Sequence, residues 1–332
     1  MVFMMEKSIN KQRSFLEPSV DELVRLDHPY RTLLSIVDFT GLTRGLQSLI
    51  CRKYGRPGYN LESGFRALIL QWMEDLSDRE LERYLQENTA AKLFCGFTLS
   101  ERTPDHSYFS ELRKKIGTSK LAKLFNKFGD KLEDKGLVSN VFTFVDASKM
   151  ISKVNMWNAR DKAIVAGEET LNNKNISKYT SDKDADYGCK GKEDYWYGYK
   201  RHVSVCMKHG FITKTAVTPA SCPDAKGLKH ICPSQGMVLG DKAYCSKEAQ
   251  RTMKGRNCHS GAILKNNMKD KNRDKDRFLT KLRAPFEGVF SKLDKRVRYK
   301  GIAKVQFQGI MQALSHNFKR LIKMKAPPLV FG

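Results

Sequence analysis

Apolar residues recur every three or four positions through roughly the first 135 residues, which is the spacing of short amphipathic helices. Residues 19–22 and 77–80 are both Ser-x-x-Glu sequences, and each predicts a helix start because the two side chains can bond to backbone N–H groups reciprocally. Asn60 is placed to cap a helix, and Thr103-Pro104 resembles a cap followed by proline at the first helical position. With a further amphipathic stretch at 121–132, these signals predict a compact helical module.

The pattern changes after this module, where β-branched and aromatic residues become frequent. Residues 141–146 and 236–241 are short apolar runs that each end on an acid, and both predict buried strands. Residues 197–207 and 211–219 flank a Lys-His-Gly sequence and predict a hairpin. The segment 161–194 is rich in Lys, Asp, Asn and Gly, so we expect a long loop or an insertion there.

Helices and strands alternate in the remainder of this second part. A helix is predicted over 224–231, another after Ser246, a strand over 262–264, and a helix face between Phe278 and Val297. Strands that alternate with helices favour an α/β domain with a mixed sheet.

The chain of 332 residues carries a formal net charge of +24, which points to a polyanionic partner such as DNA or RNA. A solubility surplus and a membrane-surface protein are the alternatives. The apolar runs are too short to cross a bilayer, and residues 1–7 do not resemble a signal peptide. Eight cysteines without a Cys-x-x-Cys pair suggest reduced thiols, so we expect a cytoplasmic protein.

Three acids are candidates for chemistry. Asp146 and Asp241 end the two predicted strands, and acids at the carboxyl ends of strands lie at the rim of a sheet, where open α/β proteins build their sites. Glu287 lies on the late helix, one turn after Arg283. Clustered carboxylates repel one another and favour Mg²⁺ or Mn²⁺, and two such ions about 4 Å apart can drive phosphodiester chemistry. The alternative is that each strand-terminal Asp is a turn former or a helix cap.

Residues 138–300 resemble the catalytic domain of insertion-sequence transposases of the IS5 type, within the broader IS4-like group. The matching pieces are Phe-Val-Asp-Ala-Ser at 144–148, Tyr-Gly-Tyr-Lys-Arg-His at 197–202, Thr-Pro-Ala at 218–220 with Asp224, Leu-Gly-Asp-Lys-Ala-Tyr at 239–244 and Arg-Ala-Pro-Phe-Glu at 283–287. The N-terminal part resembles the helical domain of the same family at 26–29, 52–58, 76–81 and 103–107.

The resemblance implies a helical N-terminal DNA-binding or assembly domain over 1–137 and an RNase H-like catalytic domain over 138–325, with the polar insertion at about 161–194. It also implies two Mg²⁺ or Mn²⁺ ions and cut-and-paste chemistry on double-stranded DNA at terminal inverted repeats and target sites. The resemblance also implies a homodimer on DNA and a nucleoid-associated protein of a prokaryote. Asp146, Asp241 and Glu287 occupy the positions of the family's catalytic, metal-binding triad.

The chain departs from the broader group at several positions. Thr280 stands where Tyr is frequent, Asp294 where Lys is frequent and Ala243 where Gly is frequent. Pro285 either places Glu287 in the first turn of a helix or interrupts a longer one. These departures bear on contacts with DNA ends more than on the triad.

Basic and aromatic residues are the candidates for DNA contact. Residues 265–300 carry thirteen Lys or Arg against five acids, which favours a phosphate-binding surface, although a solvated helix face has the same composition. The residues expected to touch DNA are Lys200, Arg201, His202, Lys242, Arg283, Lys292, Lys295 and Arg296. Trp157, Trp196 and Tyr197 could stack on a flipped base, but core packing is their alternative role.

We therefore expect a DDE transposase, an endonuclease that cuts at element ends and transfers the freed strand into target DNA without ATP. Three alternatives remain open at this point. One is an RNase H-like nuclease that does not join strands, and another is a non-catalytic DNA-binding protein, either a decayed transposase or a regulator. The third is a basic RNA-binding protein, which aromatic platform motifs on a sheet would favour.

Overall fold

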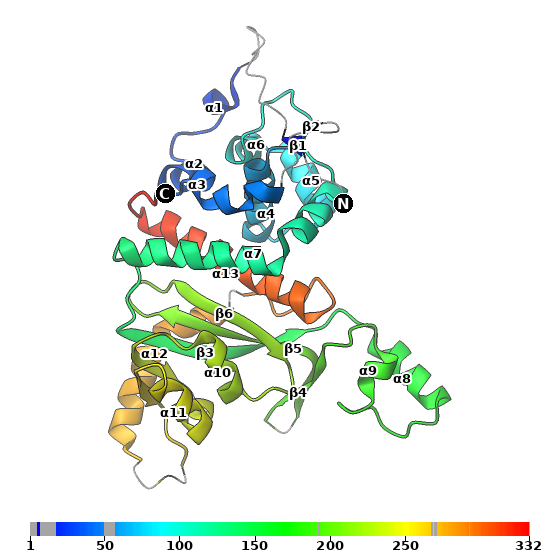
Figure 1. The fold of residues 1–332 in the computed structure, drawn as a ribbon, viewed down its shortest axis with the longest axis vertical. Coiled ribbons are helices and arrows are strands. Elements are labelled where there is room, and N and C mark those ends of the chain that lie inside the picture. Colours follow the sequence, from blue (N-terminus) through cyan, green and yellow to red (C-terminus); the bar gives the residue numbers. More distant parts are fainter. Residues whose placement is uncertain are drawn as a thin grey trace. The chain divides into compact units, whose positions relative to one another are not determined.

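The computed structural model describes residues 5–6, 18–49, 57–191, 193–266, 268, 271–291 and 293–331. The chain divides into two units, one formed by Met1–Lys135 with Leu314–Gly332 and the other by Gly136–Ala313 (Figure 1). The division at residue 314 falls within the long helix α13 (Ile302–Met324), so the C-terminal segment belongs with the N-terminal helices. Residues 1–4 and 7 of the N-terminal segment, residues 52–56 of the matching stretch 52–58, and Lys292 lie outside the described residues.

The first unit is helical, as the hydrophobic spacing predicted. Ser19 and Ser77 form the predicted capping boxes, and the Asn60 side chain accepts hydrogen bonds from the N–H groups of Glu62 and Ser63. The helices are α1 (Val20–Leu23), α2 (Pro29–Ile36), α3 (Phe39–Thr43), the 3₁₀ helix η1 (Arg44–Leu49), α4 (Leu61–Met73), α5 (Asp78–Glu87), α6 (Thr89–Cys95) and α7 (His106–Asp134). Two short strands, β1 (Met5–Glu6) and β2 (Pro57–Gly58), pair in parallel.

The helix expected to begin at Thr103-Pro104 begins later. The Asp105 side chain accepts a hydrogen bond from the Tyr108 N–H at 3.0 Å, and α7 starts at His106. The predicted stretch 121–132 is not a separate helix but the second part of α7, which is interrupted at Gly117 by a φ of 64°. Asp105 is the N-cap of α7, because a carboxylate one residue before the helix is a better acceptor for the free N–H groups than a more distant threonine.

The second unit is built on a mixed sheet. Its strands are β3 (Phe142–Ile151), β4 (Asp186–Lys190), β5 (Asp194–Cys206), β6 (Ile212–Pro219), β7 (Gly236–Gly240) and β8 (Cys258–Ala262). The strand β5 is antiparallel to β3, β4 and β6, whereas β7 is parallel to both β3 and β8. The order β6–β5–β3–β7–β8, with an antiparallel meander followed by two parallel strands, is that of an RNase H-like sheet, and the predicted fold class is confirmed.

Helices cover both faces of this sheet, as the alternation of side chains along β5 makes clear. The Arg201 side chain donates to the Gln312 side chain on α13, whereas the next residue, His202, packs its ring against Gly227 of α10 (Asp224–Ile231) on the opposite face. The remaining helices are α8 (Met156–Val165), α9 (Ile176–Tyr179), η2 (Lys242–Cys245), α11 (Lys247–Lys254) and α12 (Arg273–Ser291). The face with α10 and α11 buries an apolar cluster that includes Val145, Leu228 and Tyr244.

Two expectations about this unit were wrong in detail. The segment 161–194, which we expected to be a long loop or an insertion, is not one long loop, because it contains the second half of α8, all of α9 and the strand β4, which pairs with β5. The strand predicted at 262–264 lies earlier, over Cys258–Ala262, where parallel pairing with β7 satisfies the backbone of a sequence with little apolar character.

None of the helices in the described parts of the chain combines the length and apolar character needed to cross a bilayer. The seven cysteines in the described ranges have free thiols.

Candidate active site

We expected Asp146 to end a strand, but it lies in the middle of β3. The strand continues to Ile151 because β5 pairs with it along this whole length. The parallel partner β7, however, accompanies β3 only as far as the pair Phe144 and Leu239. Asp146 is therefore two residues past the point where the sheet opens on one side, and it is only partly buried.

Asp241 occupies the corresponding position after β7. It directly follows Gly240, the last residue of that strand, and its Oδ1 accepts a hydrogen bond from the Ala243 N–H at 2.9 Å, so it also caps η2. Because β3 and β7 run in parallel, the two aspartates lie at the same edge of the sheet.

The electrostatics of Asp146 show this proximity. The pKa of Asp146 is raised to about 6, first by burial and then, to smaller extents, by the charges of Asp241 and Asp224. The Ala147 N–H, which donates to Asp146 Oδ1 at 2.8 Å, and the Arg283 guanidinium oppose this rise. A carboxyl with a raised pKa between like charges is typical of a site that is completed by a cation.

Glu287 is held differently, on the exposed face of α12. Its side chain is 53% exposed, and its Oε1 accepts a hydrogen bond from Arg283 Nη2 at 3.2 Å. Arg283 in turn donates from Nη1 to the Gly240 carbonyl at 3.3 Å and lies over the Phe144 ring, 5.3 Å from its centroid. Arg283 therefore links Glu287 to the edge that carries Asp241. Of the two roles weighed for Pro285, the structure has the second, a proline inside a longer helix.

The expected DNA contacts fall into two groups. Lys242, Lys295 and Arg296 are exposed, and Arg283 is mostly buried with 12% of its side chain exposed. Arg201 and His202, by contrast, are 1% and 0% exposed, so their expected contact with a DNA backbone disagrees with the structure. The Arg201 side chain donates to Gln312, to the Asp294 carbonyl and to Ser148, and His202 shares a hydrogen bond with Thr218 at 2.9 Å. Both are polar core residues.

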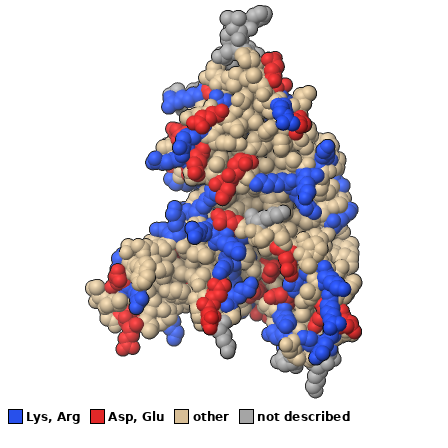
Figure 2. Space-filling model, turned by 180° about the vertical axis from the view of Figure 1, so that it is seen from behind, with Lys and Arg blue, Asp and Glu red and all other residues tan. Residues whose placement is uncertain are grey.

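Figure 2 shows Lys and Arg side chains spread over one face of the molecule, with acidic side chains among them. The basic residues Arg273, Lys275, Arg277 and Lys281 of α12 are all exposed. Of the aromatic candidates for base stacking, Trp196 and Tyr197 are buried in the core and Trp157 is 72% exposed. Only Trp157 is available to a ligand.

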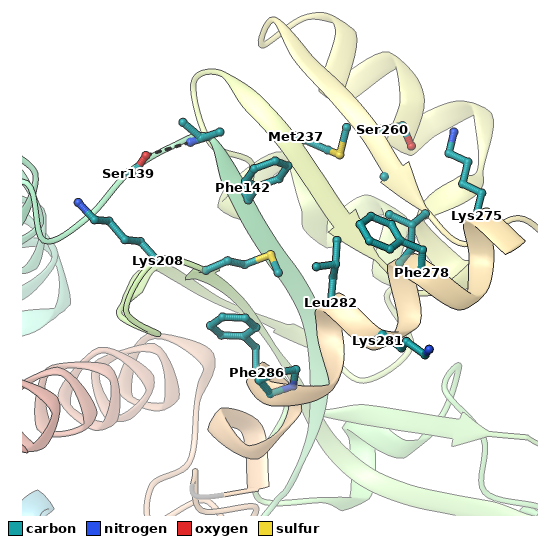
Figure 3. Close-up of a pocket in the computed structure, with 15 residues that line it drawn as sticks. Ser139, Phe142, Lys208, Met237, Ser260, Lys275, Phe278, Lys281, Leu282 and Phe286 are labelled. Atoms are coloured by element: carbon teal, nitrogen blue, oxygen red, sulfur yellow. Dashed lines mark hydrogen bonds between the residues drawn. The ribbon is translucent and has the colours of Figure 1, made fainter.

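A pocket of about 820 Å³ lies between α12 and the sheet. Figure 3 shows Phe278, Leu282 and Phe286 of α12 facing Phe142 and Met237 across it. The lysines that line the pocket, Lys208, Lys275 and Lys281, extend their ammonium groups to its periphery (Figure 3). The helix that carries Glu287 is therefore separated from part of the sheet by apolar space.

Lys200, one of the expected DNA contacts, has only 16% of its side chain exposed. Asp224 and Tyr244 are the residues of this region whose roles the sequence did not reveal. Asp224 is the first residue of α10, and its Oδ1 accepts a hydrogen bond from Lys200 Nζ at 2.9 Å. The Tyr244 side chain is 1% exposed. Their place within the matching motifs was the available signal, but an acid that begins a helix is ordinarily a favourable N-terminal charge and nothing more.

Comparisons with known proteins agree with this geometry. Residues 18–115 match the family model described as Transposase domain (DUF772), and residues 164–318 match the one described as Transposase DDE domain. The chain is a DNA transposase, an enzyme with the DDE-type catalytic domain. No curated protein matches it.

Two solved structures match the chain with low sequence identity and low TM-scores. One is a cryo-EM structure of the piggyBac transposase synaptic complex with hairpin DNA, with a TM-score of 0.40, 10% identity, and coverage of 89% of this chain and 73% of that one. The other is the Mos1 transposase paired-end complex with left transposon end, with a TM-score of 0.19, 7% identity, and coverage of 85% and 84%. No residue of this chain takes a role from either.

DDE transposases as a class depend on divalent metal ions. The chemistry of the sheet edge fits such an ion, because the like charges that raise the pKa of Asp146 are those a hard cation would neutralise. Within the described residues, no group of three or more His, Cys, Asp or Glu side chains is arranged to hold a metal, and Glu287 is bound to Arg283 instead.

Proposed function

We propose that the chain is an insertion-sequence transposase of the IS5 type, and that Asp146, Asp241 and Glu287 are its catalytic carboxylates. It would hydrolyse DNA at the terminal inverted repeats of its element and join the freed 3′-hydroxyl to target DNA by transesterification. The observation that supports this assignment most directly is the parallel pairing of β3 and β7, which brings Asp146 and Asp241 to one edge of the sheet.

Asp146 and Asp241 would hold Mg²⁺ or Mn²⁺, with two ions bound when Glu287 joins them. When bound, the ions activate the attacking oxygen and stabilise the leaving oxygen at the phosphorus. Asp146 must be ionised to bind a cation, and with its pKa raised to about 6 it is ionised at neutral pH. Arg283 orients Glu287 toward the Gly240 end of β7.

The exposed cations would bind the DNA backbone. Lys242 follows Asp241 directly, and Lys295 and Arg296 follow α12, so all three flank elements that carry a catalytic carboxylate. Lys292 would join them. Phosphate contacts by Lys and Arg position DNA without reading its sequence, so recognition of the repeats would fall to the helical N-terminal domain.

We further propose that the enzyme acts as a homodimer, because two element ends must be cut and joined together, and that it works on double-stranded DNA in the cytoplasm.

The test is cleavage and joining of a DNA fragment that carries the repeats flanking the gene, with Mg²⁺ or Mn²⁺. Asp146→Asn, Asp241→Asn and Glu287→Gln are compared with the wild type. Each variant keeps the shape of the side chain and removes its charge, so each should bind DNA normally and lose both reactions by on the order of 10³-fold or more. Asp194→Asn, at an exposed ion pair with Lys149, is the matched control.

Several results would contradict the assignment. If the variants cut DNA as well as the wild type, Asp146, Asp241 and Glu287 are not the catalytic carboxylates. A wild type that binds the repeats but cuts with neither metal would favour the non-catalytic DNA-binding role, and cutting without joining would favour a nuclease.

A further inference from the structure

The segment 294–298, which follows α12, carries exposed side chains, but its backbone is bound from inside the second unit. Gln308 of α13 is 0% exposed. Its Nε2 donates to the Arg296 carbonyl at 3.0 Å, and its Oε1 accepts a hydrogen bond from the Arg298 N–H at 2.8 Å. A carbonyl and the N–H two residues later are the groups that a parallel strand would bind. One buried amide therefore takes the place of a neighbouring strand.

The sheet binds the same segment from another side. The Ile151 N–H donates to the Lys295 carbonyl at 2.7 Å, and the Ile151 carbonyl accepts from the Val297 N–H at 3.0 Å. Arg201, which is 1% exposed, donates from Nη1 to the Asp294 carbonyl at 3.3 Å. Connections on a protein surface are usually mobile, so a segment bound by a strand, a helix and a buried guanidinium is held unusually well.

The side chains of the segment point to a use for this order. Asp294 Oδ1 accepts a hydrogen bond from the Arg296 N–H at 2.9 Å, so this carboxylate adds one more bond to the backbone. Lys295 and Arg296 are both exposed, and the side chain of neither forms an ion pair or a hydrogen bond with another residue that the structure describes. A fixed backbone therefore presents two adjacent cations to the solvent.

We propose that Gln308 and Asp294 are positioning residues for DNA binding, which hold the segment 294–298 so that Lys295 and Arg296 meet DNA phosphates in one geometry. This inference rests on the proposed function, because that function assigns Lys295 and Arg296 to the DNA backbone. A cation on a fixed backbone loses less conformational freedom on binding than one on a mobile loop. The bonds of Gln308 and Asp294 should therefore raise DNA affinity although neither side chain touches DNA.

A purely structural role predicts something different. If Gln308 only joins α13 to the sheet, its loss lowers stability, and any loss of DNA affinity is the same whichever side chains stand at 295 and 296. If Gln308 acts through Lys295 and Arg296, its loss has no further effect once those cations are absent, because substitutions that remove the same contact are not additive.

Gln306, two residues earlier on α13, supplies a matched control. Its Nε2 donates to the Thr215 carbonyl at 3.1 Å, and its Oε1 accepts from the Val217 N–H at 2.6 Å. The two glutamines thus make the same pair of backbone bonds, but Gln306 holds the edge of β6, where none of the proposed DNA contacts lies. Methionine has a similar size and can make neither bond, so Gln306→Met and Gln308→Met remove the same number of bonds.

The experiment measures binding of the full-length protein to a fluorescein-labelled DNA duplex of mixed sequence, by fluorescence anisotropy at several salt concentrations. A variant with both Lys295→Gln and Arg296→Gln should bind about tenfold more weakly and lower the slope of log affinity against log salt by about 2. Gln308→Met should weaken binding about threefold in the wild type and have no effect in that double variant. Gln306→Met should bind as the wild type does.

Asp294 allows a second comparison that leaves the core intact. Asp294→Ala and Asp294→Asn both remove the charge, but only Asn keeps an acceptor for the Arg296 N–H. Asp294→Ala should therefore bind the duplex about twofold more weakly than Asp294→Asn. Should Gln308→Met not fold, as its melting temperature would report, this comparison decides, and equal affinities of the two Asp294 variants overturn the proposal.

The outcomes separate this inference from the proposed function. If Gln308→Met binds as the wild type does, weakens binding equally in both backgrounds, or has the same effect as Gln306→Met, the positioning role is wrong and the DNA contacts stand. If the variant without Lys295 and Arg296 binds as tightly as the wild type, those contacts and the positioning role both fail, and the catalytic carboxylates are unaffected. A wild type that does not bind the duplex overturns the proposed function as well.

Discussion

The sheet edge that carries Asp146 and Asp241 and the helix α12 that carries Glu287 hold their carboxylates by different means. The residues just before the two aspartates, such as Phe144, Val145 and Leu239, are all 0% exposed, and strand pairing sets their register. The helix α12 buries only Leu279, Val289 and Phe290 well, exposes 60% of Phe278, and stands over an apolar pocket of about 820 Å³.

The difference teaches which carboxylates the fold positions in advance. A strand in a sheet is fixed by hydrogen bonds on its paired edges, whereas a helix is fixed only by the side chains it buries. Asp146 and Asp241 are therefore placed by the backbone, and Glu287 is placed through Arg283. We expect the sheet edge to form the cation site and α12 to complete it for catalysis.

The largest expected effect tests directly whether the sheet edge and α12 differ in how they place their carboxylates. Asp146→Asn, Asp241→Asn and Glu287→Gln should all lose cleavage, but only the two aspartate variants should also lose Mn²⁺ affinity, by more than about tenfold. Titration of Mn²⁺ against each variant, alongside the cleavage assay, measures both. A loss of affinity in Glu287→Gln as large as that in Asp146→Asn would mean that α12 is as well placed as the strands.

The pH dependence of cation binding sharpens the same comparison. Since the pKa of Asp146 is raised to about 6, its protonation should weaken Mn²⁺ binding about tenfold for each pH unit below that value. In Asp146→Asn the remaining affinity should vary less between pH 7 and pH 5. An equally steep wild-type profile centred near pH 4 would show that this carboxyl is not perturbed.

The same group also links metal-free stability to pH. The folded pKa of about 6 lies above the ordinary aspartate pKa of 3.8, so the folded state binds this proton more tightly than the unfolded state. The contribution is fully present below about pH 4 and is lost as the pH rises through about 6. Asp146→Asn should therefore raise the melting temperature at pH 7.5 relative to the wild type and lose that advantage at pH 4. A variant that melts below the wild type at pH 7.5 would contradict the expected direction of this pH dependence.

The smallest expected effect compares a glycine of α10, a helix that packs on the sheet, with a glycine of α12. An added Cβ at Gly227 of α10 would lie 2.2 Å from Cε1 of the buried His202, whereas at Gly288 of α12 it would meet no atom within 4 Å. Gly227→Ala should cost about 1–3 kcal/mol of unfolding free energy, and Gly288→Ala should add about 0.5–1 kcal/mol through helix propensity. Urea denaturation measures both. Equal effects of the two substitutions would mean that α12 is packed as tightly as the sheet.

Local signals in the sequence were sufficient for many elements. The capping boxes at Ser19 and Ser77, the cap at Asn60 and the helix over 224–231 are all observed, because the groups that bond lie within four residues of one another. Strand alternation and the order of elements likewise predicted the mixed sheet. The predicted strand ends pointed to Asp146 and Asp241, and the resemblance supported these two and Glu287 among the 36 acids of the chain.

Other features depended on partners that are distant in the chain. Arg201 and His202 suggested a DNA-binding sequence, but the helices that pack on the two faces of β5 bury both. The strand β8 has few apolar residues and exists through its pairing with β7. The helix α13 carried no motif, yet its Gln312 accepts the buried Arg201 guanidinium.

The sequence by itself determined the helical first part, the α/β second part, the basic charge and the acids worth testing, because each depends on spacing or composition along the chain. Only the tertiary structure decided that Asp146 lies within a strand and that Glu287 is held through Arg283. Those outcomes depend on which strand ends first and on which charges burial brings together, and both are set by contacts between residues that are remote in the chain.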